Sequence, residues 1–261
     1  MDFIVREKCS EMKALARMAL RNNWGKIVLA MAIYYLLLIT IPLAIDELIP
    51  GATISQYDPL LEETMEYPLV STLYTALLAG VFEVGLYSFL IYFVRRREIN
   101  ASHLFDGFEH IVKALWLSIR IGFFVFLWSL LFIIPGIIAA LRYSQSFAVL
   151  ADHPEYSAGQ CMGVSKQYMK QNKGKYFCLI LSLFGWALLA AVPSALTLLL
   201  PEVLLDGVVY VLIDYVLSIP HFFFLAYFNT SMIVFYELVS RNLVAAPREE
   251  AAEEVKDEFN F

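Results

Sequence analysis

Two long stretches of the chain, residues 27–94 and 176–240, contain no lysine or arginine, although the chain has 19 of these residues. Both stretches are strongly apolar, and each has room for two bilayer crossings of about 20 residues apiece. Hydrophobic residues make up 60% of the sequence and charged residues 17%, whereas soluble domains have roughly 45–50% and about 25%. This composition excludes a soluble domain and a disordered chain, and it predicts an all-α, polytopic transmembrane helical bundle.

The basic residues mark the segments that stay on one side of the membrane. Six lie within residues 1–26, and the next blocks lie in 95–120 and 142–175, while acidic residues crowd 46–66. Because lysine and arginine are retained on the cytoplasmic side, we expect both termini in the cytoplasm and an acidic tail, 241–261, that is disordered. The expected spans are about 27–45, 69–94, 116–134, 137–151, 176–200 and 207–239.

The apolar run 121–141 has two interpretations. Basic segments flank it on both sides, so a hairpin that turns at Pro135 and Gly136 keeps both segments in the cytoplasm and gives six spans. A single long helix kinked at Pro135 gives five spans, but it breaks the charge rule. The hairpin is the favoured interpretation.

Three segments predict basic amphipathic helices at the membrane surface. The first lies before residue 26, the second runs from about Ser102 to Trp116, and the third begins at Ser157, which forms a capping box with Gln160. Basic residues beside a span bind anionic lipid headgroups. The residues expected to contact headgroups are Arg17, Arg21, Lys26, Lys166, Lys170 and Lys175.

The first and third of these helices end in a similar pattern. Five positions recur 149 residues apart, namely Arg17, Arg21, Asn23, Gly25 and Lys26 against Lys166, Lys170, Asn172, Gly174 and Lys175. The pattern is typical of a helix end beside anionic headgroups, and two such sites can arise independently. Alternatively, the chain contains two parallel repeats with a site at their interface.

Three ionisable residues fall within the expected spans: Glu83, Arg142 and Asp214. A charge at the bilayer centre costs about 2.5–3.5 kcal/mol, so these groups should face one another or water. Counting from the outer ends of the spans favours Arg142 and Asp214 as a pair and leaves Glu83 more isolated. A structural salt bridge is one interpretation, and a polar pathway for a proton, ion or anionic solute is the other.

The sequence predicts no catalytic centre, metal site or cofactor. It contains no nucleophile elbow, zinc-protease, Walker or dinucleotide-binding motif. His103, Asp106, Glu109 and His110 have the spacing of a ligand set, but a solvated helix face explains them more simply. A net charge of −6 makes nucleic acid an unsuitable partner.

Several motifs resemble the bacterial integral membrane family known as domain of unknown function 975. This resemblance runs from about residue 12 to 240. A looser resemblance is to the membrane region of some glycerophosphodiester phosphodiesterases, whose catalytic barrel is absent here. The first resemblance implies a bacterial plasma membrane protein and no established activity. The motifs are Asn23-Trp24-Gly25-Lys26, the run 127–138, Tyr143-Ser144-Gln145-Ser146, Asp152-x-Pro154, Asn172-Lys173-Gly174-Lys175 and Phe235-Tyr236-Glu237.

Two functions remain open from the sequence. We expect a non-enzymatic scaffold or accessory subunit that interacts with membrane lipids or a membrane protein partner through its basic helices and acidic tail. The alternative is a small transporter with a polar pathway near Glu83, Arg142 and Asp214.

Overall fold

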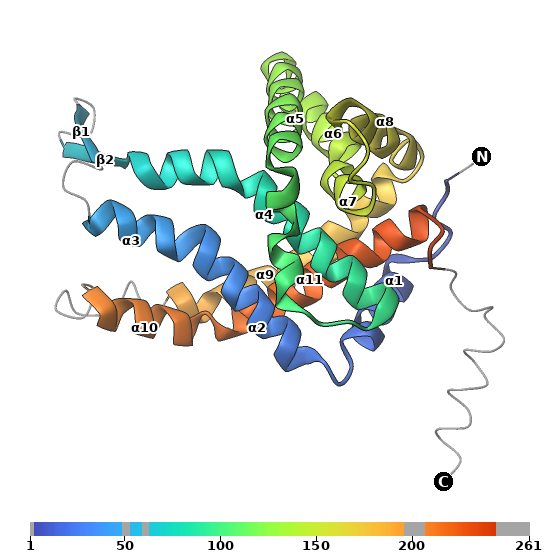
Figure 1. The fold of residues 1–261 in the computed structure, drawn as a ribbon, viewed down its shortest axis with the longest axis horizontal. Helices are drawn as coiled ribbons and strands as arrows, with labels where there is room; N and C mark the ends of the chain where they lie inside the picture. Colours follow the sequence, from blue (N-terminus) through green and yellow to red (C-terminus); the bar gives the residue numbers. More distant parts are fainter. Residues whose placement is uncertain (1–2, 49–52, 59–62, 196–206, 244–261) are drawn as a thin grey trace, which may run out of the picture.

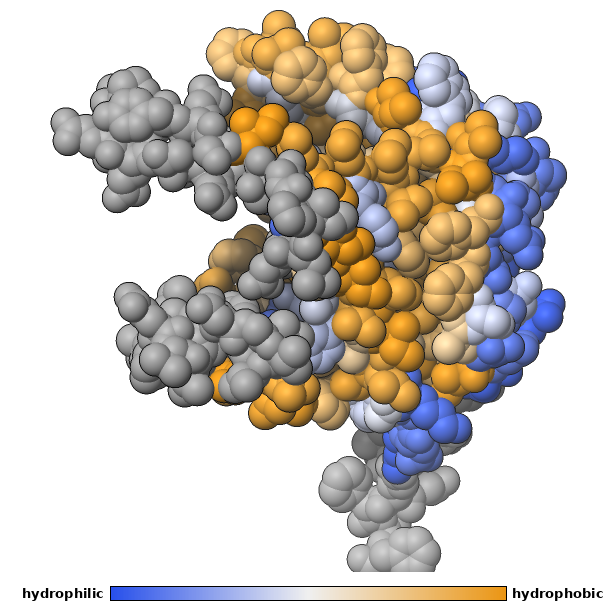
Figure 2. All heavy atoms as spheres, turned by 60° about the vertical axis from the view of Figure 1, so that its left-hand side comes forward, coloured by the Kyte–Doolittle hydropathy of each residue, from blue (hydrophilic) through white to orange (hydrophobic). Residues whose placement is uncertain are grey.

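The computed structural model describes residues 3–48, 53–58, 63–195 and 207–243, and it is a helical bundle (Figure 1). Within the described residues, six helical segments are long and apolar enough to cross a membrane, which confirms the predicted fold class. A broad apolar surface adjoins a hydrophilic one (Figure 2), as in a multi-pass membrane protein. The six segments are Trp24–Asp46, Leu69–Arg96, Ala101–Leu131, Ile133–Asp152, Lys173–Ala195 and Ile219–Val239.

The first third of the chain forms a short helix and two long helical segments that run side by side (Figure 1). The carboxylate of Asp46, near the end of the first long segment, accepts hydrogen bonds of 3.0–3.2 Å from the backbone amides of Val70 and Ser71. These amides belong to the first turn of the second long segment, so Asp46 caps the start of that helix. The elements are α1 (Cys9–Leu20), α2 (Trp24–Tyr35), the π-helix η1 (Leu36–Thr40), α3 (Ile41–Leu48), an antiparallel hairpin of β1 (Thr53–Asp58) and β2 (Glu63–Pro68), and α4 (Leu69–Arg96).

The middle of the chain forms a hairpin, and its reversal lies at Phe132 rather than at Pro135 and Gly136. Phe132 has extended backbone angles and separates two helices. Lys113, near the start of the first of these helices, donates a 2.5 Å hydrogen bond to the carbonyl of Pro154, so by Pro154 the chain has returned to the level at which the hairpin began. Pro135 instead lies in the first turn of a helix. Backbone N–H groups in the first turn form no hydrogen bond within the helix, so the lack of an N–H in proline costs nothing there. The elements are the 3₁₀ helix η2 (Ala101–His110), α5 (Ile111–Leu131), α6 (Ile133–Tyr143) and α7 (Ser146–Asp152).

This hairpin projects to one side of the bundle instead of following the long axis shared by α4 and the α2–α3 segment (Figure 1). Its tip is apolar, and Phe132, Ile133 and Ile134 are between 71% and 78% exposed. Water cannot solvate such a tip favourably, so the hairpin is suited to contact with lipid.

The last part of the chain repeats the design of the first. The expected span 207–239 is divided at Ser218 into α10 and α11, and Pro220 lies at the start of α11. The Ser157 and Gln160 capping box at the start of α8 is present as predicted. The elements are α8 (Ala158–Tyr168), α9 (Lys173–Ala195), α10 (Gly207–Leu217) and α11 (Ile219–Val239).

The repeat extends from the sequence pattern to the helices. The starts of α8, α9 and α11 follow those of α1, α2 and α4 by 149, 149 and 150 residues. Each half therefore has an amphipathic helix, one long segment and a second long segment that returns, with the η2–α7 region between the halves. This correspondence favours two parallel repeats over independent helix ends.

The apolar face of α1 is covered by protein, which corrects its expected contact with lipid. Met12 and Ala16 are fully buried in a cluster that includes Leu179 of α9 and Phe235 of α11. Burial of a side chain such as Met12 contributes roughly 1.5–3 kcal/mol. We call the end of the bundle that carries α1, α8 and the C-terminal ends of α4 and α11 the basic end (Figure 1).

Two glycines let η2 pack closely on α4. A Cβ atom at Gly85 would collide with the carbonyl of Leu104, and a Cβ atom at Gly107 would collide with the carbonyl of Val81. The two backbones therefore approach as closely as small residues allow.

Candidate functional site

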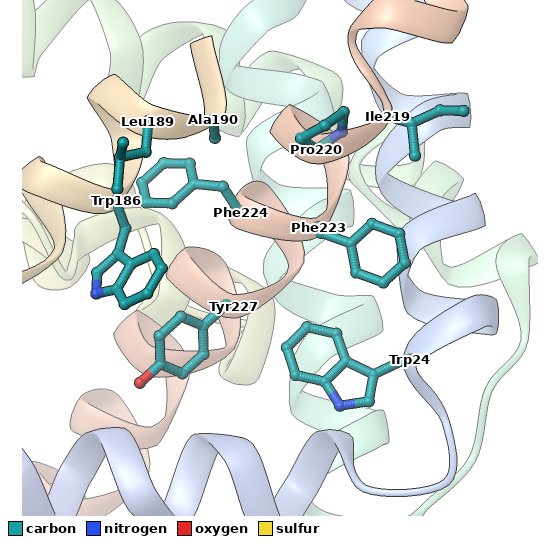
Figure 3. Close-up of a pocket in the computed structure, with 9 residues that line it drawn as sticks. All are labelled: Trp24, Trp186, Leu189, Ala190, Ile219, Pro220, Phe223, Phe224 and Tyr227. Atoms are coloured by element: carbon teal, nitrogen blue, oxygen red, sulfur yellow. The ribbon is translucent and has the colours of Figure 1, made fainter. Parts of the chain in front are cut away.

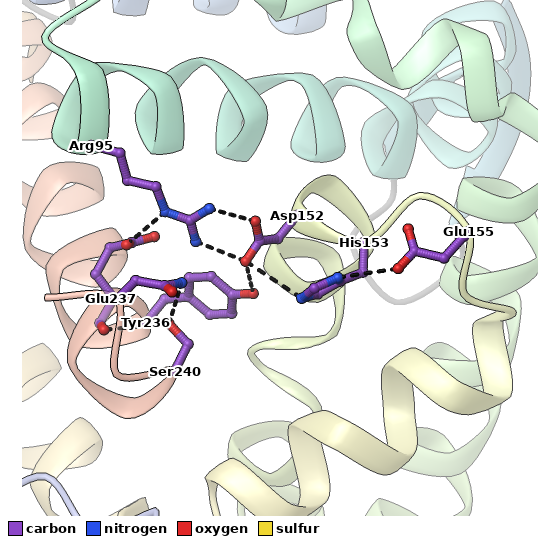
Figure 4. A network of polar contacts seen from close by, with 8 residues as sticks. Arg95, Asp152, His153, Glu155, Tyr236, Glu237 and Ser240 are labelled. Atoms are coloured by element: carbon purple, nitrogen blue, oxygen red, sulfur yellow. Dashed lines mark hydrogen bonds and ion pairs between the residues drawn. The ribbon is translucent and has the colours of Figure 1, made fainter.

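An arginine at the end of α4 joins two carboxylates from distant parts of the chain (Figure 4). The Arg95 guanidinium donates to both oxygens of Asp152 at 2.6 and 2.7 Å and to Glu237 at 2.8 Å. The hydroxyl of Tyr236 donates to Asp152 at 2.8 Å. A bidentate arginine–carboxylate pair of this kind is strong and geometrically specific. The cluster ties α4, α7 and α11 together at the basic end.

The charges within this cluster are unequal. Side-chain exposure is 29% for Arg95, 10% for Asp152 and 0% for Glu237. One carboxylate oxygen of Glu237, Oε1, is buried and has no hydrogen-bond partner among the described residues. A buried acceptor without a partner is costly, so this carboxylate depends on Arg95 for its compensation.

A polar cavity of about 210 Å³ adjoins the cluster. Its lining includes Ser88, Tyr92, Arg95 and Asp152. Ser88 also donates a 2.5 Å hydrogen bond to Asp106 of η2, so η2 contributes to the polar surroundings of this region. The cavity has room for a few ordered water molecules, each of which takes about 30 Å³.

The structure brings together two of the four residues that had the spacing of a ligand set. Nδ1 of His103 lies 2.9 Å from a carboxylate oxygen of Asp106, and the His103 ring stacks on Tyr92 with 4.0 Å between centroids. Across the described part of the chain, no three His, Cys, Asp or Glu side chains are grouped to hold a metal ion.

The structure does not join the three charges expected within the spans. No salt bridge or side-chain hydrogen bond connects Arg142 with Asp214 or Glu83 among the described residues, and the carbonyl of Arg142 instead accepts a 2.9 Å hydrogen bond from Ser165. Glu83 is half-buried on α4, within electrostatic range of the hydroxyls of Tyr34, Tyr87 and Tyr176.

The six residues expected to contact headgroups differ in solvent exposure. Arg17, Arg21, Lys26, Lys166 and Lys170 are exposed. Lys175 is half-buried and donates to the carbonyl of Val5, so it holds the N-terminal segment against α9. Asn172 has a related role, because it accepts a 3.0 Å hydrogen bond from the amide of Val5.

Sequence reasoning missed the Arg95 cluster. Arg95 was grouped with the basic residues outside the spans, and Asp152, Tyr236 and Glu237 entered only through the family resemblance. Glu237 lies within the expected span 207–239. An ionisable residue within an expected span needs a partner, and this argument, which was applied to Glu83 and Asp214, applies equally to Glu237. It would have led to a search for an arginine that pairs with Glu237.

Comparisons with known proteins identify a family and no characterised relative. No curated protein and no solved structure matches the chain, and the looser similarity to glycerophosphodiester phosphodiesterases finds no support. The family model described as "Protein of unknown function (DUF975)" matches residues 6–141 and 130–243, which together cover most of the sequence. The chain therefore belongs to the DUF975 family.

Proposed function

We propose that the chain is a non-enzymatic plasma membrane scaffold or accessory protein that binds anionic phospholipid at its basic end. The observation that supports this is the exposure of five basic residues on a molecule whose hydrophilic surface adjoins a broad apolar one (Figure 2). They are Arg17 on α1, Arg21 after it, Lys26 on α2, Lys166 on α8 and Lys170 after it. A basic residue near an anionic membrane surface is worth about 1 kcal/mol. With this end in the cytoplasm, the positive-inside rule is satisfied.

The test compares the full chain in nanodiscs of phosphatidylcholine with the same nanodiscs containing phosphatidylglycerol. We expect the anionic lipid to raise the thermal unfolding temperature, and we expect 1 M salt to weaken the effect because the Debye length falls to about 3 Å. Replacing the five exposed basic residues with glutamine should abolish the difference. Equal unfolding temperatures in the two lipids would refute the proposal.

An accessory role also requires a protein partner. The acidic tail 241–261 is the proposed docking segment, and its residues 244–261 lie outside the described part of the chain. Native mass spectrometry of the full chain and of a chain ending at Arg241 tests this role, because a stoichiometric partner should disappear with the tail. A partner retained without the tail would place the docking surface elsewhere.

A transporter is the second candidate, and the surroundings of Glu83 favour it. Its side chain is half-buried on α4, within electrostatic range of three tyrosine hydroxyls, and it forms no salt bridge among the described residues. An ionisable group of this kind within a span is a default candidate for an ion or proton pathway. Proton flux into proteoliposomes that Glu83→Gln abolishes would favour the transporter, and flux that is absent from the unmodified chain would exclude this pathway.

A further inference from the structure

A groove between α9, α11 and the start of α2 is walled by aromatic side chains (Figure 3). Its volume is about 560 Å³, within the range of roughly 300–1,000 Å³ that is usual for ligand sites. Trp24 stacks on Phe223 with 6.0 Å between ring centroids, and Trp186 and Phe224 contribute further walls. None of the nine lining residues is acidic or basic.

One end of the groove is polar because α1 passes beside it. The hydroxyl of Tyr227 accepts a 3.0 Å hydrogen bond from the Arg17 guanidinium and donates at 3.4 Å to the carbonyl of Lys13. Figure 3 shows Tyr227 and Trp24 on the side of the groove nearest α1. Arginine has five N–H donors, so one bond to Tyr227 leaves the exposed Arg17 able to bind an anion.

The groove opens toward the apolar surface of the bundle. Trp186 and Leu189 of α9 are each 63% exposed, and Ile219 and Phe223 of α11 are 46% and 44% exposed. An occupant can therefore enter sideways from the lipid, and it must be apolar along most of its length. Arg21 and Lys26, three residues before and two residues after the lining residue Trp24, are also exposed.

We propose that this groove binds one anionic phospholipid, with an acyl chain between Trp186 and Phe223 and the phosphate at Arg17. The proposal rests on the proposed function and assigns its lipid to a specific site. The groove is apolar along its length and has a cation at one end. An anionic phospholipid matches both features, because its acyl chain is apolar and its phosphate is negatively charged.

The internal repeat supplies a matched control for this site. Lys166 corresponds to Arg17 at the 149-residue offset, is also exposed, and lies on α8 rather than α1. Arg17→Gln and Lys166→Gln therefore change the net charge equally, but only the first removes a cation from the groove. Trp186→Ala removes an exposed wall residue and leaves the charge unchanged.

The experiment is native mass spectrometry of the full chain released from nanodiscs of equal phosphatidylglycerol and phosphatidylcholine with identical acyl chains. We expect one phosphatidylglycerol molecule to be retained in preference to phosphatidylcholine. Arg17→Gln should weaken this retention at least about tenfold, which corresponds to about 1.4 kcal/mol, because it removes a charge-assisted hydrogen bond to the phosphate. Trp186→Ala should weaken retention of both lipids, and Lys166→Gln should leave it unchanged.

The outcomes separate this site from the broader function. Selective retention that responds equally to Arg17→Gln and Lys166→Gln would overturn the groove and leave anionic lipid binding intact. Equal retention of the two lipids would show annular lipid only and would overturn both proposals. Tyr227→Phe is the control for a structural effect of the Arg17 variant, because it removes the hydrogen bonds between Tyr227 and α1 and keeps the aromatic wall of the groove. If Tyr227→Phe retains the lipid and Arg17→Gln loses it, the guanidinium binds the lipid directly.

Discussion

Replacing Arg95 with glutamine should destabilise the bundle severely. The substitution removes three hydrogen bonds of 2.6–2.8 Å and leaves Asp152 and Glu237 close together without a cation. Glu237 is 0% exposed, so bulk water does not reach its carboxylate in the folded chain. The two remaining carboxylates then repel each other at the junction of α4, α7 and α11.

The size of the effect follows from the burial of the cluster. Removing one partner of a buried ion pair costs about 3–5 kcal/mol, and the 29% exposure of the Arg95 side chain favours the lower end, about 3 kcal/mol. For a protein of this size, 1 kcal/mol corresponds to a shift in unfolding temperature of about 2–4 °C, so we expect a decrease of about 6–12 °C. Glu237→Gln should cost less because it also removes the excess negative charge.

The assay is thermal unfolding of the purified chain in mild detergent, followed by size-exclusion chromatography. Arg96→Gln is the control, since the exposed neighbouring side chain should change stability by no more than about 0.5 kcal/mol. The double variant Arg95→Gln with Glu237→Gln should recover part of the loss, with a coupling of about 0.5–3 kcal/mol. The reasoning fails if Arg95→Gln unfolds at the same temperature as Arg96→Gln, or if the two losses simply add.

Four further predictions use the same purified chain. Gly85→Ala should lower the unfolding temperature by separating η2 from α4, whereas Gly122→Ala, which meets no neighbour, should not; similar shifts would contradict the close packing. Asp46→Ala should cost about 1 kcal/mol through loss of the cap on α4, and an unchanged melting curve would argue against that cap. A cysteine at Ile133 should react with a membrane-permeant maleimide and resist a charged one, and efficient labelling by the charged reagent would put the tip in water. Burial raises the pKa of the Cys161 thiol to about 11, so only about 0.1% is thiolate at pH 8, and iodoacetamide should modify it slowly until the chain unfolds; fast labelling of the folded chain would contradict this.

The number of apolar segments could be predicted because the signal is compositional. Stretches without lysine or arginine, such as 27–94, exclude most alternatives to membrane crossing whatever the tertiary packing is. The capping box at Ser157 was also predictable, since it depends on residues three positions apart.

The pairing of charges could not be predicted by counting depth along each span. That count assumes straight spans that share one axis. The α5–α6 hairpin projects sideways, and the last apolar segment is divided at Ser218, so the depths assigned to Arg142 and Asp214 do not correspond to positions in the bundle. Arg95 pairs instead with residues 57 and 142 positions later, a choice that only the packing of three helices determines.

The order in which a ribosome delivers the chain gives the Arg95 cluster a second significance. Asp152 emerges 57 residues after Arg95, whereas Glu237 emerges 142 residues after it. At about 5–20 residues per second, roughly 7–28 s separate the synthesis of Arg95 from that of Glu237. Once Asp152 has been made, the arginine can engage it alone until the final helix brings Glu237, which forms a salt bridge with Arg95 and with no other cation among the described residues. Insertion of α11 thus adds a second carboxylate to a junction begun much earlier, and it brings the hydroxyl of Tyr236 to Asp152 in the same step.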